Sequence, residues 1–273
     1  MANTDRIIAE RTRDAELIVL GCGTSTGVPI PGCDCAVCTS QDPKNTRLRT
    51  SAYITFPNGE ALLVDASPDL RAQSLANHIR HVDGVFYTHA HADHILGTDD
   101  LRVFNFRRSG PIPCYGSTVT TDLLKKFFGY IFEPDPSYEG GALANLSIHP
   151  LRGSASFQFA GTAIHPIELY HGSLPVLGLR IGELAYATDC NCIPESSLDL
   201  MRGVKVLFLD GLRYEHHPTH FTIDQAVAIA QQIGAEKTYL IHMTHNIDYH
   251  EVNKKLPKGV ELAFDGLRVQ FSV

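Results

Sequence analysis

A short histidine-rich motif constrains this chain more than any other feature of its sequence. Residues 89–94 read His-Ala-His-Ala-Asp-His and directly follow Gly84-Val85-Phe86-Tyr87, an apolar run typical of a buried strand. A strand that ends in a tight loop can direct four side chains around one point: those of His89, His91, Asp93 and His94. Imidazole nitrogens and carboxylate oxygens suit Zn²⁺, Mn²⁺ and Fe²⁺. Four such groups are too many for one catalytic ion that keeps open positions, so the motif predicts two adjacent ions.

The alternative interpretation is a solvated histidine-rich loop that binds no metal. Compositional histidine tracts seldom interleave an acid at fixed spacing, as this motif does, so the metal interpretation is favoured.

The composition is that of an ordinary globular protein. The chain has 273 residues, a formal net charge of −7 and a hydrophobic fraction of 44%. No repeat or linker divides it, so we predict a single domain over residues 1–273. An acidic chain is a poor generic binder of nucleic acid, because phosphate affinity usually depends on a basic surface. The charge therefore favours a small substrate, with nucleic acid not expected as a partner.

No segment of the sequence predicts export or membrane insertion. The first 20 residues are rich in charged side chains and lack an apolar core for a signal peptide. Apolar runs elsewhere are short, as in residues 206–209. The expectation is a cytoplasmic protein with no membrane association. The sequence leaves the oligomeric state open, and a homodimer is one arrangement that it allows.

Three of the seven cysteines form a compact cluster. Cys33, Cys35 and Cys38 have the spacing of a chelating turn, and in a cytoplasmic chain they are expected to be thiols or metal ligands. A structural zinc needs four ligands, so a fourth would come from elsewhere in the chain. The alternative is a loop of reduced thiols. Cys22 and Cys114 flank apolar runs and are interpreted as core residues.

Strand-like and helical patterns alternate along the chain. The first predicted strand, 16–20, leads into a glycine-rich loop at residues 21–27, and residues 129–145 are interpreted as a long loop or lid. Two successive halves of strands with helices between them predict two sheets packed face to face, with helices outside. The remaining predicted strands are 52–56, 61–64, 84–87, 112–115, 146–151, 163–169, 176–181, 184–188, 205–209 and 237–241, with two more in 260–271, and the predicted helices are 68–77, 118–127, 194–201, 222–233 and 249–256.

Single histidines and acids at later strand ends are candidates to complete the metal site. His171, Asp189 and His242 each end an apolar run, where loops gather over a sheet. A single residue at a strand end more often forms a hydrogen bond within its loop. Three residues with the same placement, however, are the further metal ligands that the motif at residues 89–94 lacks. Asp189 can offer one oxygen to each of two ions. Asp65, at the end of the run 61–64, either orients a ligand imidazole or caps the following helix.

This pattern resembles the metallo-β-lactamase-fold hydrolases over nearly the whole chain. The resemblance implies an α/β (α+β) fold, a four-layer αββα sandwich, with a dinuclear metal site. By the family pattern, His89, His91 and His171 hold one ion. Asp93, His94 and His242 hold the other, and Asp189 bridges the pair.

A later motif is similar to one of the phosphodiesterase branch of this fold. His220-Phe221-Thr222 resembles the His-x-Thr motif shared by transfer-RNA 3′-processing nucleases and phosphoribosyl cyclic phosphodiesterases. A protonatable imidazole beside helix-terminal amides suits a phosphate. His220 is therefore expected to be catalytic, contacting the phosphate and helping to protonate the leaving oxygen. Asp93 is expected to be catalytic as well as a metal ligand. The nearby His216 and His217 are interpreted as surface residues.

The cysteine loop resembles that of the phosphoribosyl 1,2-cyclic phosphate phosphodiesterases, the PhnP-like family. In that family the fourth zinc ligand lies three residues after the last catalytic histidine. Here that histidine is His242, so the fourth ligand would be His245. The resemblance implies one structural Zn²⁺ held by Cys33, Cys35, Cys38 and His245. Related cofactor-biosynthesis proteins share the loop, so the loop alone does not fix the substrate.

The expected activity is metal-dependent hydrolysis of a small, cyclic ribose phosphate or nucleotide phosphodiester, with a water between two Mn²⁺ or Zn²⁺ ions as the nucleophile. The alternatives are a transfer-RNA 3′-processing endonuclease, against which the cysteine loop and the lack of a long basic insertion argue, and an ester, lactone or thioester hydrolase, against which His220 argues.

Overall fold

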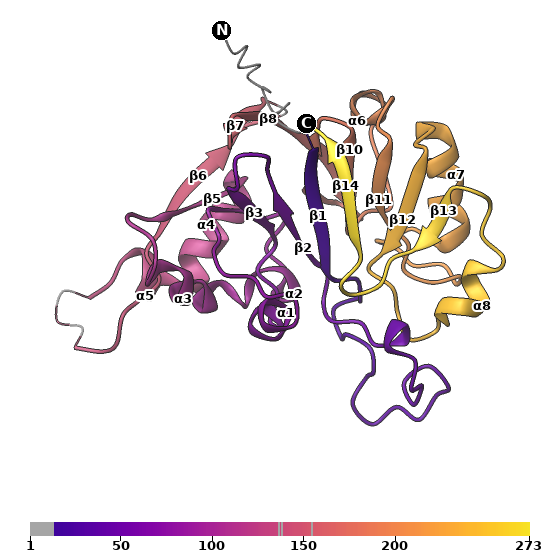
Figure 1. Ribbon diagram of the computed structural model, residues 1–273, viewed down its shortest axis with the longest axis horizontal. Coiled ribbons are helices and arrows are strands. Elements are labelled where there is room, and N and C mark those ends of the chain that lie inside the picture. The colour runs from indigo at the N-terminus through magenta and orange to yellow at the C-terminus, as the bar shows by residue number, and fades with distance from the viewer. Residues whose placement is uncertain (1–13, 136, 138, 154) are drawn as a thin grey trace, which may run out of the picture.

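Two seven-stranded sheets form the centre of the protein, and helices cover their outer faces (Figure 1). The computed structural model describes residues 14–135, 137, 139–153 and 155–273. The strand order of the first sheet is β14-β1-β2-β3-β4-β5-β6, and that of the second is β13-β12-β11-β10-β9-β8-β7. The C-terminal strand β14 pairs with β1, so the first sheet contains both ends of the described chain. The predicted four-layer αββα sandwich is confirmed.

The first sheet is built from β1 (Asp14–Gly21), β2 (Ser51–Thr55), β3 (Ala61–Val64), β4 (Gly84–Phe86), β5 (Ile112–Ser117), β6 (Leu146–Leu151) and β14 (Arg268–Ser272). The second is built from β7 (Phe157–Phe159), β8 (Thr162–His171), β9 (Leu174–Ile181), β10 (Leu184–Ala187), β11 (Val206–Asp210), β12 (Lys237–Ile241) and β13 (Val260–Leu262). The outer layers contain α1 (Leu70–Ala76), α2 (Ala92–Ile95), α3 (Arg102–Asn105), α4 (Thr118–Phe127) and α5 (Gly129–Phe132) on one side, and α6 (Glu195–Met201), α7 (Ile223–Ile233) and α8 (Tyr249–Asn253) on the other.

The alternation of side chains along β1 explains how one strand serves two cores. Leu17 and Val19 point into the core between the two sheets, which also contains Phe208 of β11. Ile18 and Leu20 point the other way, into the core beneath the helices of the first half. Because successive side chains of a strand project from opposite faces, a strand that is apolar at every position must be covered on both sides.

The predicted helix that starts with a capping box is present as α7. The Thr222 side chain accepts from the Gln225 amide while the Gln225 side chain accepts from the Thr222 amide, which satisfies two amides at the helix start. Gly234, with φ of 76°, ends the helix in the left-handed conformation that glycine adopts without strain.

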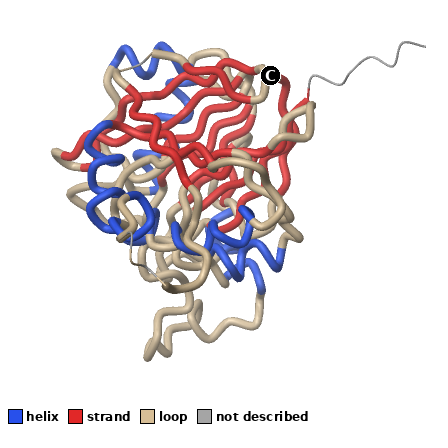
Figure 2. Tube along the Cα trace, turned by 90° about the vertical axis from the view of Figure 1, so that its left-hand side faces the viewer, coloured by secondary structure: helices blue, strands red, loops and turns tan. Residues whose placement is uncertain are grey.

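The carboxyl ends of the parallel strands position the candidate site. β3 and β4 run parallel in the first sheet, and β10, β11 and β12 run parallel in the second. Three residues just after these strands have positive φ without being glycine: Asp65 after β3, Asp189 after β10 and His242 after β12. Such backbone conformations are costly and concentrate at functional sites. Loops gather along the lower edge of the strands in Figure 2, and the longest, between β1 and β2, lies at the bottom of Figure 1.

The main departures from the predicted elements are short ones. Residues 129–145, predicted as an irregular loop, begin with the one-turn helix α5. Strand β7 and the four-residue helices α2 and α3 were not predicted, because elements of three or four residues are too short to show a periodic pattern. In the described part of the chain, no helix has the length and apolar character that crossing a bilayer requires.

Candidate active site

The histidine-rich motif lies in a loop that Asp65 anchors to the first sheet. The Thr88 amide donates to Asp65 Oδ1 and the Thr88 hydroxyl donates to Asp65 Oδ2, both at 2.8 Å. His89 and His91 precede helix α2, whereas Asp93 and His94 lie in its first turn. This change from extended to helical backbone within six residues turns the four side chains toward a common centre.

Three histidines form the first candidate ligand cluster: His89, His91 and His171. One ring nitrogen of each lies within 4.8 Å of the others. His89 Nε2 and His91 Nδ1 are 3.0 Å apart. His171, the last residue of β8, has Nδ1 at 2.9 Å from the Thr219 carbonyl oxygen. Because the ring donates there, Nε2 of His171 is the nitrogen left to bind a metal.

The second candidate ligand cluster consists of Asp93, His94, Asp189 and His242, all buried. Asp189 Oδ2 lies 3.3 Å from His94 Nε2 and 3.2 Å from His242 Nε2. Asp93 Oδ2 lies 3.3 Å and 3.5 Å from the same two nitrogens. Nitrogen and oxygen ligands about 2.1 Å from a tetrahedral ion are about 3.4 Å apart, which matches these separations.

Asp189 connects the two clusters. Its Oδ2 atom also lies 3.7 Å from His89 Nε2 in the first cluster. The carboxylate is buried, and the charges of His242, His94 and His89 outweigh the cost of burial and hold the pKa of Asp189 well below its ordinary value. An ionised carboxylate placed between two groups of imidazoles has the position needed to bridge two cations.

The charge balance of the site fits divalent ions. Among the described residues, no lysine or arginine forms an ion pair with Asp93 or Asp189, so only histidines face these buried carboxylates. Burial opposes the charge on His94, but Asp189, Asp65 and Asp93 outweigh it and raise its pKa. The Nε2 atoms of His94 and His242 are buried without a hydrogen-bond partner among the described residues. A bound cation would satisfy both nitrogens and neutralise the carboxylates.

Asp65 contacts a candidate ligand directly. Its Oδ2 atom lies 2.7 Å from Nδ1 of His94, and both groups are fully buried. This contact fixes the ring so that Nε2 faces the second cluster, as carboxylates commonly do for metal-binding histidines. The alternative role of Asp65, capping the following helix, is not seen. The residue at the N-cap position of helix α1 is Asp69, which makes no side-chain cap hydrogen bond.

His220 stands beside both clusters. Its ring centroid is 4.5 Å from that of His171 and 4.7 Å from that of His242. Nδ1 of His220 lies 2.9 Å from Asp210 Oδ2, so Nε2 is the nitrogen available to a substrate. Asp210 ends β11, and its Oδ2 atom also accepts from the amides of Cys190 and Phe221.

Asp210 was missed in the sequence, although a usable signal was present. Like Asp189, it is an acid at the carboxyl end of a largely apolar strand. The interpretation of His217 as a surface residue is corrected: the side chain is half-buried, and its ring centroid lies 5.1 Å from that of His220. His216 is exposed, as expected.

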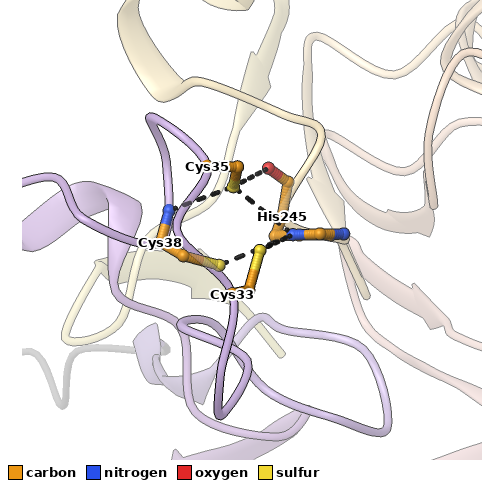
Figure 3. Close-up of side chains that lie close together, drawn as sticks. All are labelled: Cys33, Cys35, Cys38 and His245. Atoms are coloured by element: carbon orange, nitrogen blue, oxygen red, sulfur yellow. Dashed lines mark hydrogen bonds between the residues drawn. The ribbon is translucent and has the colours of Figure 1, made fainter.

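The cysteine cluster and His245 converge on one point (Figure 3). The Sγ atoms of Cys33, Cys35 and Cys38 lie 3.3, 3.4 and 3.5 Å from His245 Nδ1. Sulfur and nitrogen ligands of tetrahedral zinc are separated by about 3.6 Å, so the four atoms fit around one ion. The Cys38 amide donates to Cys35 Sγ, and this contact, together with the side chains of Cys33, Cys38 and His245, lowers the pKa of Cys35 to about 6, whereas burial raises the pKa of Cys38. The thiolate that binds metal is therefore favoured first at Cys35.

Comparison with known proteins identifies relatives over most of the chain. The model of the β-lactamase superfamily domain matches residues 60–243. A crystal structure of a new diphosphatase from the PhnP family is 41% identical in sequence and superposes with a TM-score of 0.88, over 95% of this chain and 98% of that one.

Two further relatives are more distant or only partly covered. The octanoyltransferase of Porphyromonas gingivalis is 38% identical over 252 residues, but the match spans 92% of this chain and only 50% of that protein. Zn²⁺-bound PqqB from Methylobacterium extorquens has a TM-score of 0.73 over 93% of this chain and 99% of that one, at 18% identity, which shows a common fold alone.

Proposed function

Because the chain belongs to the β-lactamase superfamily, and within it to the PhnP family, we propose that it is a metal-dependent phosphodiesterase acting on a small, cyclic ribose phosphate or nucleotide. The comparisons show that the chain has the fold of the metallo-β-lactamase hydrolases. The observation that supports the proposed phosphodiesterase activity is the imidazole of His220, held by Asp210 beside two metal-ligand clusters.

The proposed ligands are those of the two clusters. His89, His91 and His171 would hold one ion, Asp93, His94 and His242 the other, and Asp189 both. Two divalent ions would supply an activated water and neutralise charge on a phosphoryl group. The donor set suits Mn²⁺ or Zn²⁺, and the cysteine cluster suits a structural Zn²⁺.

The protein's own residues define how a phosphodiester would be treated. An imidazolium at His220, paired with buried Asp210, would attract the phosphate and hold a proton at Nε2 for the leaving oxygen. Asp210 fixes the ring orientation, because its Oδ2 atom is itself held by two backbone amides. Asp93 is proposed to contribute as an anionic ligand: burial opposes its ionisation, but His94 and His242 hold its pKa below the ordinary value.

Hydrolysis of a phosphoanhydride is the second candidate. The relative at 41% identity is described as a diphosphatase. The phosphoanhydride bond of a diphosphate differs from a phosphodiester bond in its leaving group, which is a phosphate and not an alcohol. The same residues would serve, because both reactions expel an oxygen from phosphorus. A transfer-RNA substrate agrees less well with a chain whose net charge is −7, and a thioester would leave the imidazole of His220 without an anionic group to contact.

The test is hydrolysis of bis(p-nitrophenyl) phosphate by the metal-loaded protein, with a β-lactam and a thioester as comparison substrates. We expect diester hydrolysis alone, and thioester turnover without diester hydrolysis would refute the proposal. In His220→Ala, the diesterase rate should fall by about 10²–10⁴-fold with the metal content unchanged. His149→Ala is the matched control, since His149 is an exposed histidine on β6 that contacts neither cluster. Loss of metal from His220→Ala would instead make His220 a ligand.

A further inference from the structure

The segment that follows β12 carries ligands for both kinds of metal site. His242 lies directly after the strand and belongs to the second cluster, whereas His245, three residues later, faces the three cysteines (Figure 3). Residues 242–248 form neither helix nor strand before α8 begins. Because such a segment lacks a regular pattern of hydrogen bonds, other groups must satisfy its backbone and fix its shape.

Arg47 donates to backbone carbonyls on both sides of His245. Its Nη1 atom donates to the Thr244 carbonyl oxygen at 3.2 Å, and its Nη2 atom donates to the Ile247 carbonyl oxygen at 2.6 Å. The guanidinium is planar and rigid, so these two bonds fix the distance between the two carbonyl groups. Among the described residues, the backbone of residues 245–247 has one other hydrogen bond to a different segment, a long one from Cys35 Sγ to the His245 carbonyl oxygen at 3.9 Å.

The backbone of Arg47 closes the loop that contains the cysteines. The Arg47 amide donates to the Val28 carbonyl oxygen, and the Val28 amide donates to the Arg47 carbonyl oxygen, both at 2.8 Å. Cys33, Cys35 and Cys38 lie between these two positions in the sequence. One residue therefore fixes the base of the cysteine loop through its backbone and the turn around His245 through its side chain.

The burial of Arg47 is costly. In the described part of the chain it is the only arginine or lysine whose side chain is fully buried. Arg49 and Arg108 each pair with a carboxylate, but no ion pair is formed by Arg47 among the described residues, and its Nε atom is buried without a hydrogen-bond partner there. Burial lowers the pKa of Arg47, which reflects the cost of a cation at this position. An apolar side chain of similar volume would avoid that cost, so stability alone does not account for an arginine here.

We propose that Arg47 is the positioning residue of the cysteine cluster: its guanidinium holds His245 against the three cysteines, so that the four ligands are arranged before the ion binds. Groups that orient a metal ligand raise metal affinity in this way, because less freedom is lost on binding. The proposal concerns the structural metal site and does not depend on the proposed phosphodiesterase activity.

The experiment measures Co²⁺ binding to the metal-free, full-length protein. Among the clustered groups of the described residues, only this one contains cysteine, so the thiolate-to-cobalt charge-transfer absorption reports this site and not the histidine clusters. The variants are Arg47→Met, Arg47→Lys, His245→Ala and the double variant of Arg47→Met with His245→Ala. Arg108→Met is the matched control, because Arg108 is a half-buried arginine paired with Asp83, at the end of β4 opposite to the histidine-rich motif.

Arg47→Met should raise the dissociation constant for Co²⁺ at this site by about 10- to 100-fold, which is the usual effect of removing a group that orients a metal ligand. Arg47→Lys retains a cation and one donor group and should lose less affinity. In the His245→Ala background, Arg47→Met should have no further effect, because no ligand is left to position. Arg108→Met should bind Co²⁺ as the wild type does.

An unchanged dissociation constant in Arg47→Met, even with a lower Tm, would overturn the proposal, since Arg47 would then support the fold alone. An equal loss of affinity in the His245→Ala background would also overturn it, as would a comparable loss in Arg108→Met or the absence of charge-transfer absorption in the wild type. If Arg47→Met does not fold, Arg47→Lys and its double variant with His245→Ala provide the same comparison.

Discussion

Replacing Cys35 by serine tests whether a metal holds the long loop between β1 and β2. Residues 29–44 contain no buried side chain, so the apolar core cannot fix this segment. Several of its backbone hydrogen bonds are local, such as that from the Thr39 amide to the Cys35 carbonyl oxygen. The cluster of three cysteines with His245 joins positions more than 200 residues apart in sequence. Losing one ligand should therefore release the loop from the segment after β12.

The size of the effect follows from linkage between binding and folding. An ion present at 100 to 1,000 times its dissociation constant stabilises the folded chain by about 2.7–4.1 kcal/mol. For a chain of this length each kcal/mol shifts Tm by about 2–4 °C, so Cys35→Ser should lower Tm by about 5–15 °C. The purified variant should also contain one zinc fewer than the wild type.

The assay combines metal analysis by mass spectrometry, calorimetric melting and limited proteolysis, which should cut the variant within residues 29–44. Cys192→Ser is the matched control, because Cys192 is an exposed thiol outside the cluster. An unchanged zinc content and Tm in Cys35→Ser would refute the structural site. A fall of equal size in Cys192→Ser would show that the effect is not specific to the cluster.

Three further predictions concern the site and its support. Asp210→Asn should lower the diesterase rate by about 10²-fold or more and retain the metal content, because the neutral amide would replace the charged acceptor that orients the His220 ring; an unchanged rate would contradict this. Burial raises the pKa of Asp265 to about 7, so the folded chain holds a proton that the unfolded chain releases, and this contribution to stability falls as the pH rises from about 4 to 7. Relative to Asp265→Asn, the urea-measured free energy of unfolding of the wild type should fall by about 2 kcal/mol between about pH 5 and 7, and a constant difference would exclude the effect. Gly97→Ala would place a Cβ 2.0 Å from the Ser67 carbonyl oxygen and should destabilise the chain by about 1–3 kcal/mol, whereas a Tm equal to that of the wild type would contradict the close packing seen there.

The layered fold could be predicted because apolar runs in the sequence correspond to strands that are buried between layers. Runs such as residues 206–209 are apolar at every position, which is expected of strands covered on both faces. The start of α7 could be predicted from the Thr-x-x-Gln capping box. The pairing of β1 with β14 could not, because no local pattern relates strands about 250 residues apart.

The candidate ligands that could be predicted are of two kinds: those concentrated in the motif at residues 89–94, and those that lie at the ends of strands. His171, Asp189 and His242 each come at the end of a strand, and the structure brings them to the motif. The role of Asp210 was not identified, because it depends on contacts that folding creates, with the His220 ring and with the amides of Cys190 and Phe221. A single sequence does not encode such contacts as a spacing.

Anomalous X-ray diffraction from crystals of the metal-loaded protein tests the central claim most directly. We expect three metal peaks. One lies among Cys33, Cys35, Cys38 and His245, and two lie on either side of the Asp189 carboxylate, each next to one histidine cluster. No peak at Asp189, or a single ion bound by only a few of these side chains, would contradict it.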